Sequence, residues 1–162
     1  MPRLQFTRRL QKGFSLVEVL VALVVLSVGM LGIAGLYVIT LRSGGSAIAR
    51  TQAVSLANDI ADRIRANRLA TTAYNTPGTP VNNSCVGGTV NCTRAQMAAE
   101  DLWQWNQQIQ AALPGSPSGS IVVVQGAPVN ANNMRTPSRY TITVSWSDID
   151  ATTLSHVVVI EV

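Results

Sequence analysis

The chain is poor in the residues that build catalytic and metal sites. Its 162 residues include one histidine, His156, and two cysteines. No serine is paired by motif with a histidine or lysine, and no glycine-rich loop ends in the Lys-Ser/Thr pair that holds phosphate. Asp148-x-Asp150 lacks the further oxygen ligands of a calcium loop. We therefore predict a protein that is not an enzyme and has no metal and no cofactor.

Acidic residues are absent from the first seventeen positions, where Arg3, Arg8, Arg9 and Lys12 gather. The formal net charge of +4 comes from this segment, because the remaining chain has equal numbers of basic and acidic residues. Basic residues beyond residue 13 are scattered, so the sequence shows no nucleic-acid-binding track. The positive charge is thus interpreted as a targeting feature.

Charge is also nearly absent from the long apolar run between Phe14 and Leu41, whose only charged residue is Glu18. Its 28 residues would make a helix of about 42 Å, longer than the roughly 30 Å hydrocarbon core of a bilayer. Basic residues before such a run predict a single-pass membrane protein with a cytoplasmic N-terminus and an exported C-terminal part.

Glu18 is unexpected in this position. A charged side chain at the centre of a membrane helix costs roughly 2.5–3.5 kcal/mol, so an acid in the run indicates a function. Phe14 lies four residues earlier, one helical turn away on the same face. Cleavage after Gly13 would create an amine on Phe14 that could compensate the carboxylate.

The junction Lys12-Gly13-Phe14-Ser15-Leu16-Val17-Glu18 resembles the class III leader of type IV pilins and pseudopilins. The resemblance implies that a prepilin peptidase cleaves between Gly13 and Phe14 and methylates the Phe14 amine, and that Glu18 is the assembly carboxylate. Two alternatives are a secretory signal peptide and an uncleaved anchor. The apolar run is too long for the 7–15-residue core of a signal peptide.

Glycines interrupt the apolar run at three-residue spacing. Gly29, Gly32 and Gly35 form either a packing face or a flexible site for assembly, or positions where a membrane helix merely tolerates glycine. Gly44 and Gly45 follow, and they predict a kink or a thinning of the helix because each glycine costs about 1 kcal/mol relative to alanine.

A helical pattern continues to about Leu69 with an apolar stripe at 3.6-residue spacing: Ala53, Leu56, Ala57, Ile60 and Ile64. Asp59, Asp62, Arg63 and Arg65 are interpreted first as a solvated face and second as subunit contacts. The segments 53–67, 21–26 and 142–146 are similar to those of PilV-type minor pilins. This resemblance implies a minor pilin.

Residues 71–92 are rich in turn-forming residues and predict a long loop. Cys85 and Cys92 lie in it. An exported domain is exposed to an oxidising compartment, so a disulfide is favoured. Metal binding is the weaker alternative because six residues separate the cysteines and the one histidine is distant; two free thiols remain the third.

A second helix is expected from the capping box Thr93-x-x-Gln96 to Leu113, followed by Pro114-Gly115. Its apolar face contains Ala98, Leu102, Trp105, Ile109 and Leu113, and Trp103 lies off that face, where we expect partial burial. Strands are expected at 121–125, 140–147 and 154–162, the middle one with strict alternation.

The predicted fold is therefore α+β: a long N-terminal helix packed on a small C-terminal antiparallel sheet with one additional helix. The expected domains are a leader (1–13), a transmembrane helix (14–41), an amphipathic continuation (42–70) and a periplasmic or extracellular globular domain (71–162).

The pilin resemblance implies an inner-membrane subunit that assembles with other minor and major pilins into a pilus at the cell surface, as a hetero-oligomer, and so acts in pilus biogenesis, twitching motility and adhesion. One alternative is a minor pseudopilin of a type II secretion system. The other is a pilus-tip adhesin or DNA-uptake pilin that binds a ligand through the 71–92 loop.

Overall fold

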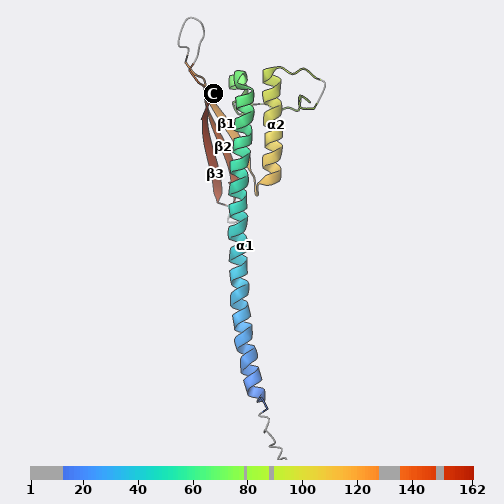
Figure 1. Cartoon of the computed structure of the whole chain (residues 1–162), viewed down its shortest axis with the longest axis vertical. Coiled ribbons are helices and arrows are strands. Elements are labelled where there is room, and N and C mark those ends of the chain that lie inside the picture. Colours follow the sequence, from blue (N-terminus) through green and yellow to red (C-terminus); the bar gives the residue numbers. More distant parts are fainter. Residues whose placement is uncertain (1–12, 79, 88–89, 128–135, 149–151) are drawn as a thin grey trace, which may run out of the picture. The chain divides into compact units, whose positions relative to one another are not determined.

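The computed structural model describes residues 13–78, 80–87, 90–127, 136–148 and 152–162. It has the predicted α+β fold (Figure 1). In chain order the elements are α1 (Leu16–Ala66), the 3₁₀ helix η1 (Arg68–Tyr74), α2 (Arg94–Ala112), β1 (Ser118–Val124), β2 (Arg139–Ser147) and β3 (Thr153–Glu161).

The chain divides into two compact units, Met1–Leu41 and Arg42–Val162, which are described separately. In the described part of the first unit, residues 13–41, every residue is exposed. Among the described helices, α1 is long and apolar enough to cross a membrane. Its helical conformation continues without interruption through Gly44 and Gly45, so the expected thinning of the helix there is not observed.

The second unit contains a three-stranded antiparallel sheet in the order β1-β2-β3. In its register Ile121 of β1 pairs with Ile142 of β2, which pairs in turn with Val158 of β3. The alternation predicted for β2 is confirmed: Tyr140, Ile142, Val144 and Trp146 are all buried. Their common face is the inner face of the sheet.

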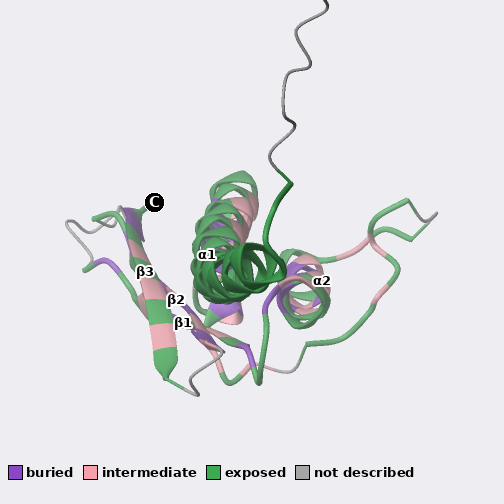
Figure 2. Cartoon of the chain, turned by 90° about the horizontal axis from the view of Figure 1, so that it is seen from below, coloured by how far each residue is buried: buried purple, intermediate pink, exposed green. Residues whose placement is uncertain are grey.

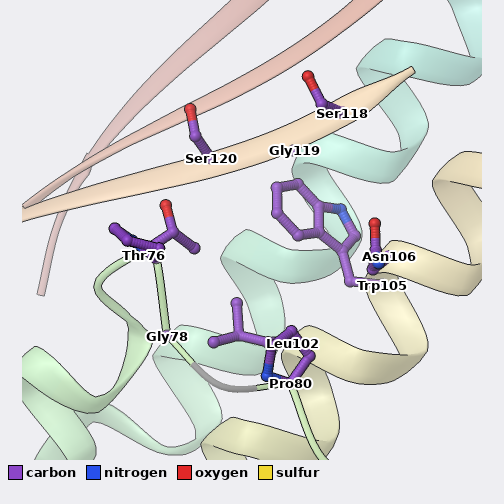
Figure 3. Close-up of a pocket in the computed structure, with 10 residues that line it drawn as sticks. Thr76, Gly78, Pro80, Leu102, Trp105, Asn106, Ser118, Gly119 and Ser120 are labelled. Carbon is purple, nitrogen blue, oxygen red and sulfur yellow. The ribbon is translucent and has the colours of Figure 1, made fainter. Parts of the chain in front are cut away.

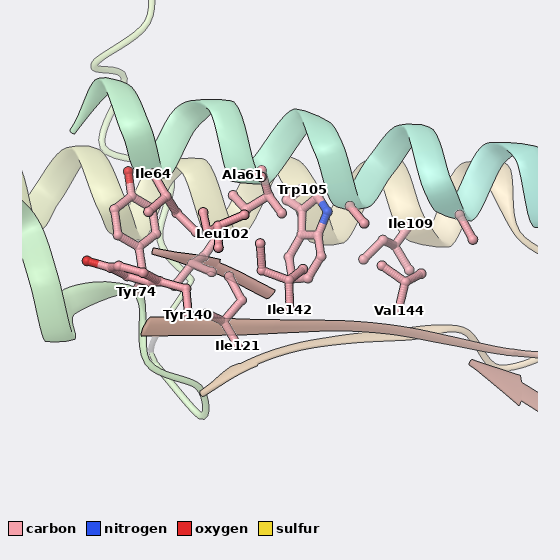
Figure 4. Packing of buried hydrophobic residues seen from close by; sticks show 14 of the residues in the cluster. Ala61, Ile64, Tyr74, Leu102, Trp105, Ile109, Ile121, Tyr140, Ile142 and Val144 are labelled. Atoms are coloured by element: carbon pink, nitrogen blue, oxygen red, sulfur yellow. The ribbon is translucent and has the colours of Figure 1, made fainter. Parts of the chain in front are cut away.

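Residues of α1 beyond position 42 pack lengthwise over this inner face (Figures 2 and 4). The buried stripe consists of Ala49, Ala53, Ala57, Ile60, Ala61 and Ile64. Leu56, predicted to belong to the stripe, is only half-buried. Its carbonyl oxygen accepts a hydrogen bond from the indole Nε1 of Trp105 at 3.0 Å, which ties α1 to α2.

Helix α2 begins as predicted. The Thr93 side chain accepts a hydrogen bond from the Gln96 backbone N–H, and the Gln96 side chain accepts one from the Thr93 N–H, which completes the capping box. The predicted apolar face is buried at every position: Ala98, Leu102, Trp105, Ile109 and Leu113. Trp103 is half-buried.

The loop prediction for residues 71–92 is partly wrong. The long helix ends at Ala66, and η1 then extends four residues into the predicted loop. Tyr74, at the end of η1, is fully buried in the core. Its aromatic ring gives this turn-rich segment an anchor that local turn signals did not reveal. Strand β1 also begins three residues before the predicted boundary, at Ser118.

Candidate functional site: the start of α1 and the disulfide loop

The N-terminus of α1 determines where Glu18 lies. The carbonyl oxygen of Ser15 accepts hydrogen bonds from the backbone N–H groups of Glu18, at 3.1 Å, and Val19, at 3.3 Å. Glu18 therefore lies in the first turn of the helix. A carboxylate in that turn interacts favourably with the positive end of the helix dipole, a stabilising effect that is independent of any partner.

Phe14 precedes the helix and is 84% exposed. It lines a shallow apolar hollow with Glu18 and with residues that follow at helical spacing, Ala22 and Leu26. The structure thus brings Phe14 and Glu18 to one face. The Phe14 nitrogen is an amide in the uncut chain, and among the described residues Glu18 makes no ion pair. The carboxylate is available to a cation created by cleavage or supplied by another subunit.

No neighbouring atom in the structure makes glycine necessary at Gly29, Gly32 or Gly35. A Cβ atom built on Gly29, Gly32 or Gly35 meets nothing within 4 Å. Side chains at these positions would fit the isolated chain. Any requirement for glycine must therefore come from helix flexibility or from packing against other molecules.

Cys85 and Cys92 form a disulfide bond. The loop that they close is held to α2 by Glu100, whose side chain the sequence analysis did not single out. The Glu100 carboxylate accepts hydrogen bonds from three backbone N–H groups: Cys85 at 2.7 Å, Asn83 at 3.0 Å and Val86 at 3.3 Å. These bonds, that from Cys85 above all, lower the pKa of Glu100 although its burial acts in the opposite direction. Glu100 is only 2% exposed.

Arg63 connects α1 to α2, so its interpretation as part of a solvated face is wrong. It bonds to Asp59 at 2.9 Å, as the i,i+4 spacing allows, but its guanidinium also reaches Asp101 at 3.3 Å and Gln104 at 2.7 Å. The second carboxylate oxygen of Asp101 accepts a hydrogen bond from the Tyr74 hydroxyl at 2.6 Å. Burial, and then this bond, raise the pKa of Tyr74.

A sequence signal for Asp101 existed. Asp101 lies three residues after Ala98 and four before Trp105, on the apolar face of α2, and is itself buried. Like Glu18 in its apolar run, a carboxylate on the apolar face of a helix needs a partner. The partners, Arg63 and Tyr74, come from segments that only the tertiary structure brings together.

A hollow of about 460 Å³ lies between residues 76–78 and 80, α2 and β1, with Leu102 and Trp105 at its floor (Figure 3). A Cβ on Gly119 would lie 2.5 Å from the Trp105 ring, so this glycine lets the ring pack directly against β1. Trp105 is only 2% exposed and cannot present its ring to a ligand. The hollow is a product of core packing.

Comparison with known protein families gives two matches. The model described as prokaryotic N-terminal methylation motif matches residues 8–34, which include Gly13, Phe14 and Glu18. The model described as type IV pilin Tt1218 matches residues 35–103, which include the α1 stripe and both cysteines. No curated protein and no solved structure matches the chain.

The leader motif and the exposed apolar helix fit a membrane-anchored protein. The class defined by the fold and the N-terminal site is that of pilin and pseudopilin subunits, which are structural proteins. Within that class, the two family matches support a type IV pilin. Its leader implies processing by a prepilin peptidase and assembly with other pilins.

Proposed function

We propose that the chain is a minor pilin that acts in type IV pilus biogenesis, and through it in twitching motility and adhesion. The observation that carries the proposal is the division of α1. Its first part exposes every side chain, whereas its second part buries an apolar stripe in a globular unit. A subunit with this division can leave the bilayer only if other helices replace the lipid around residues 14–41. The resemblance of residues 53–67 to PilV-type pilins favours a minor subunit.

Processing is the first step. Residues 1–13 are the leader, cleavage falls between Gly13 and Phe14, and the Phe14 amine is methylated. The leader lies on the cytoplasmic side of the inner membrane, residues 14–41 span it, and the globular part is periplasmic until the pilus forms. Intact-mass analysis of the protein extracted from membranes should show a chain that begins at Phe14 and is heavier by one CH₂ group. A mature chain that begins after Leu41 would contradict the proposal.

Glu18 acts in docking. A lone carboxylate in lipid is expelled or protonated. Docking is therefore stabilised when a neighbouring subunit, shifted along the filament, brings its own Phe14 amine to the Glu18 carboxylate of this subunit. Glu18→Ala should leave cleavage largely intact but reduce incorporation into filaments. The measurement compares the processed fraction in membranes with the amount in sheared pili, with Ser27→Ala as a control at another exposed polar position of the same helix. Normal incorporation of Glu18→Ala would rule out the docking role.

The alternative, a minor pseudopilin of a type II secretion system, shares the leader and the membrane helix. It predicts that deletion of the gene blocks protein secretion and leaves piliation unchanged. The minor pilin proposal predicts the reverse.

A further inference from the structure

The two edges of the sheet differ in how far other segments of the chain cover them. Beside β1, the Thr76 backbone N–H donates to the Ile121 carbonyl oxygen at 2.8 Å, and the Thr76 Oγ1 accepts from the Ile121 N–H at 2.8 Å. The Asn75 side chain accepts from the Val123 N–H at 3.0 Å. Residues 75 and 76 therefore cover much of the β1 edge.

A residue pair just beyond the strand ends shows which residues of β3 hydrogen-bond to β2 and which direct their backbone groups outward. Ser138 and Val162 exchange both backbone hydrogen bonds, at 2.8 and 3.0 Å. In an antiparallel ladder such pairs alternate, so the even-numbered residues of β3 bond to β2. The odd-numbered residues Ser155, Val157 and Val159 direct their N–H and C=O groups away from the sheet. In the described part of the chain nothing bonds to these groups.

This edge also lacks the features that usually protect one. Natural edge strands carry lysines, prolines, bulges or a covering segment. Between Leu154 and Ile160 there is no lysine, arginine, proline or glycine, and the β2–β3 register is continuous over all nine pairs. A strand of this kind can pair with another extended chain.

The side chains near the β3 edge indicate which kind of side chain an added partner strand must supply. On the inner face, Leu154 and Val158 are only half-buried, although their neighbours Trp146 and Ile142 on β2 are buried. The inner face is thus incompletely covered at β3. An added strand with aliphatic side chains on that face would extend the core past Leu154 and Val158.

We propose that the edge formed by Ser155, Val157 and Val159 receives an extended, uncharged strand from a second, non-identical pilin subunit. The proposal rests on the proposed function, which places other pilins beside this one. Antiparallel pairing of β3 with β3 of a second copy is unfavourable. The strands run along α1 within the second unit (Figure 1), so such pairing would turn one copy end for end, with its residue 42 directed away from the membrane.

The test uses the full chain in cells that assemble pili. A photo-crosslinking amino acid replaces Val157, which is 51% exposed at the free edge, or Val122, which is 54% exposed on the other edge strand. We expect Val157 to crosslink to an extended segment of another pilin, identified by mass spectrometry, and Val122 not to do so. Val159→Pro removes an outward N–H and should abolish the crosslink from Val157. Val159→Lys, which retains the backbone donor, should weaken it.

Equal crosslinking from both positions would show that the outer face binds the partner and would overturn the proposal. A crosslink to a second copy would overturn it as well. Absence of any crosslink from Val157 in a chain that enters sheared pili would overturn the edge proposal and leave the minor pilin proposal intact. Absence of the unsubstituted chain from sheared pili would instead contradict the proposed function.

Discussion

The two parts of α1 show how one helix can serve two environments. Up to Gly45 no residue is buried, and apolar side chains surround the helix. From Ala49 to Ile64 the helix buries one stripe, in which alanine predominates. Its other positions are polar or half-buried, apart from Val54, which is 39% exposed. Among the described residues, the first part buries no side chain, whereas the second part does. Substitutions should therefore affect assembly in the first part and folding in the second.

The largest expected effect tests this difference directly. Ile60 is fully buried and Ile33 is 56% exposed in the same helix. Ile60→Ala should lower the free energy of unfolding of the second unit by about 2–5 kcal/mol because it leaves a cavity. Ile33→Ala should change it by less than about 0.5 kcal/mol. Denaturant titration of the full chain in detergent, followed by tryptophan fluorescence, reports on the second unit, which holds all three tryptophans. Equal losses would contradict the division.

The disulfide should have the next largest effect. Replacing both cysteines with serine should cost roughly 2–3 kcal/mol, the value expected for a short loop from the chain entropy of the unfolded state. The loss should appear in the unfolding of the second unit, while Ile33→Ala remains neutral in the same background. If thiol reagents modify both cysteines without reductant, the disulfide is absent from the protein and the prediction is wrong.

We expect a smaller effect at Glu100: the local stability of the loop that it anchors should depend on pH. Its pKa is lowered in the folded chain, so its contribution to stability is complete above the ordinary value of about 4.3 and is lost as the pH falls through the folded-state pKa. Amide exchange at Asn83, Cys85 and Val86, corrected for intrinsic rates, should accelerate as the pH falls below about 4. In Glu100→Gln the acceleration should disappear. An unchanged pH profile in this variant would show that another group anchors the loop.

The smallest effect is expected at Tyr140. Its hydroxyl is buried and, among the described residues, has no hydrogen-bond partner, whereas the Tyr74 hydroxyl bonds to Asp101. Tyr140→Phe should leave stability unchanged or raise it slightly, because no hydrogen bond is lost. Tyr74→Phe should cost about 1–3 kcal/mol, since Asp101 loses a buried donor. A similar loss from both substitutions would show that Tyr140 also has a partner in solution.

Periodicity predicted much of this fold. The alternation of β2, the stripe of α2 and its capping box depend on neighbours within a few residues, so the sequence alone reveals them. The burial of Tyr74, the anchoring of the loop by Glu100 and the link from Arg63 to Asp101 each join segments that are distant in the chain. No local pattern specifies which distant group will satisfy a buried carboxylate.

The candidate site divides in the same way. Gly13, Phe14 and Glu18 form a contiguous motif, and the comparison with known families matches it. The free edge of β3 depends on the strand order and on which edge residues 75 and 76 cover. The sequence predicted three strands but not their order, and it gave no signal that one edge would be covered and the other exposed.

The lengthwise packing of α1 on the sheet has a mechanical consequence. A pull along the helix axis at residue 42 would slide the stripe from Ala49 to Ile64 over the inner face, so that its contacts bear the load in parallel. A pull perpendicular to the axis would open them one at a time. Forced unfolding is governed by the unfolding rate. Loading the contacts in shear raises the free-energy barrier to unfolding and so lowers this rate. The alanine-rich stripe would then resist unfolding of the second unit when tension is applied at residue 42.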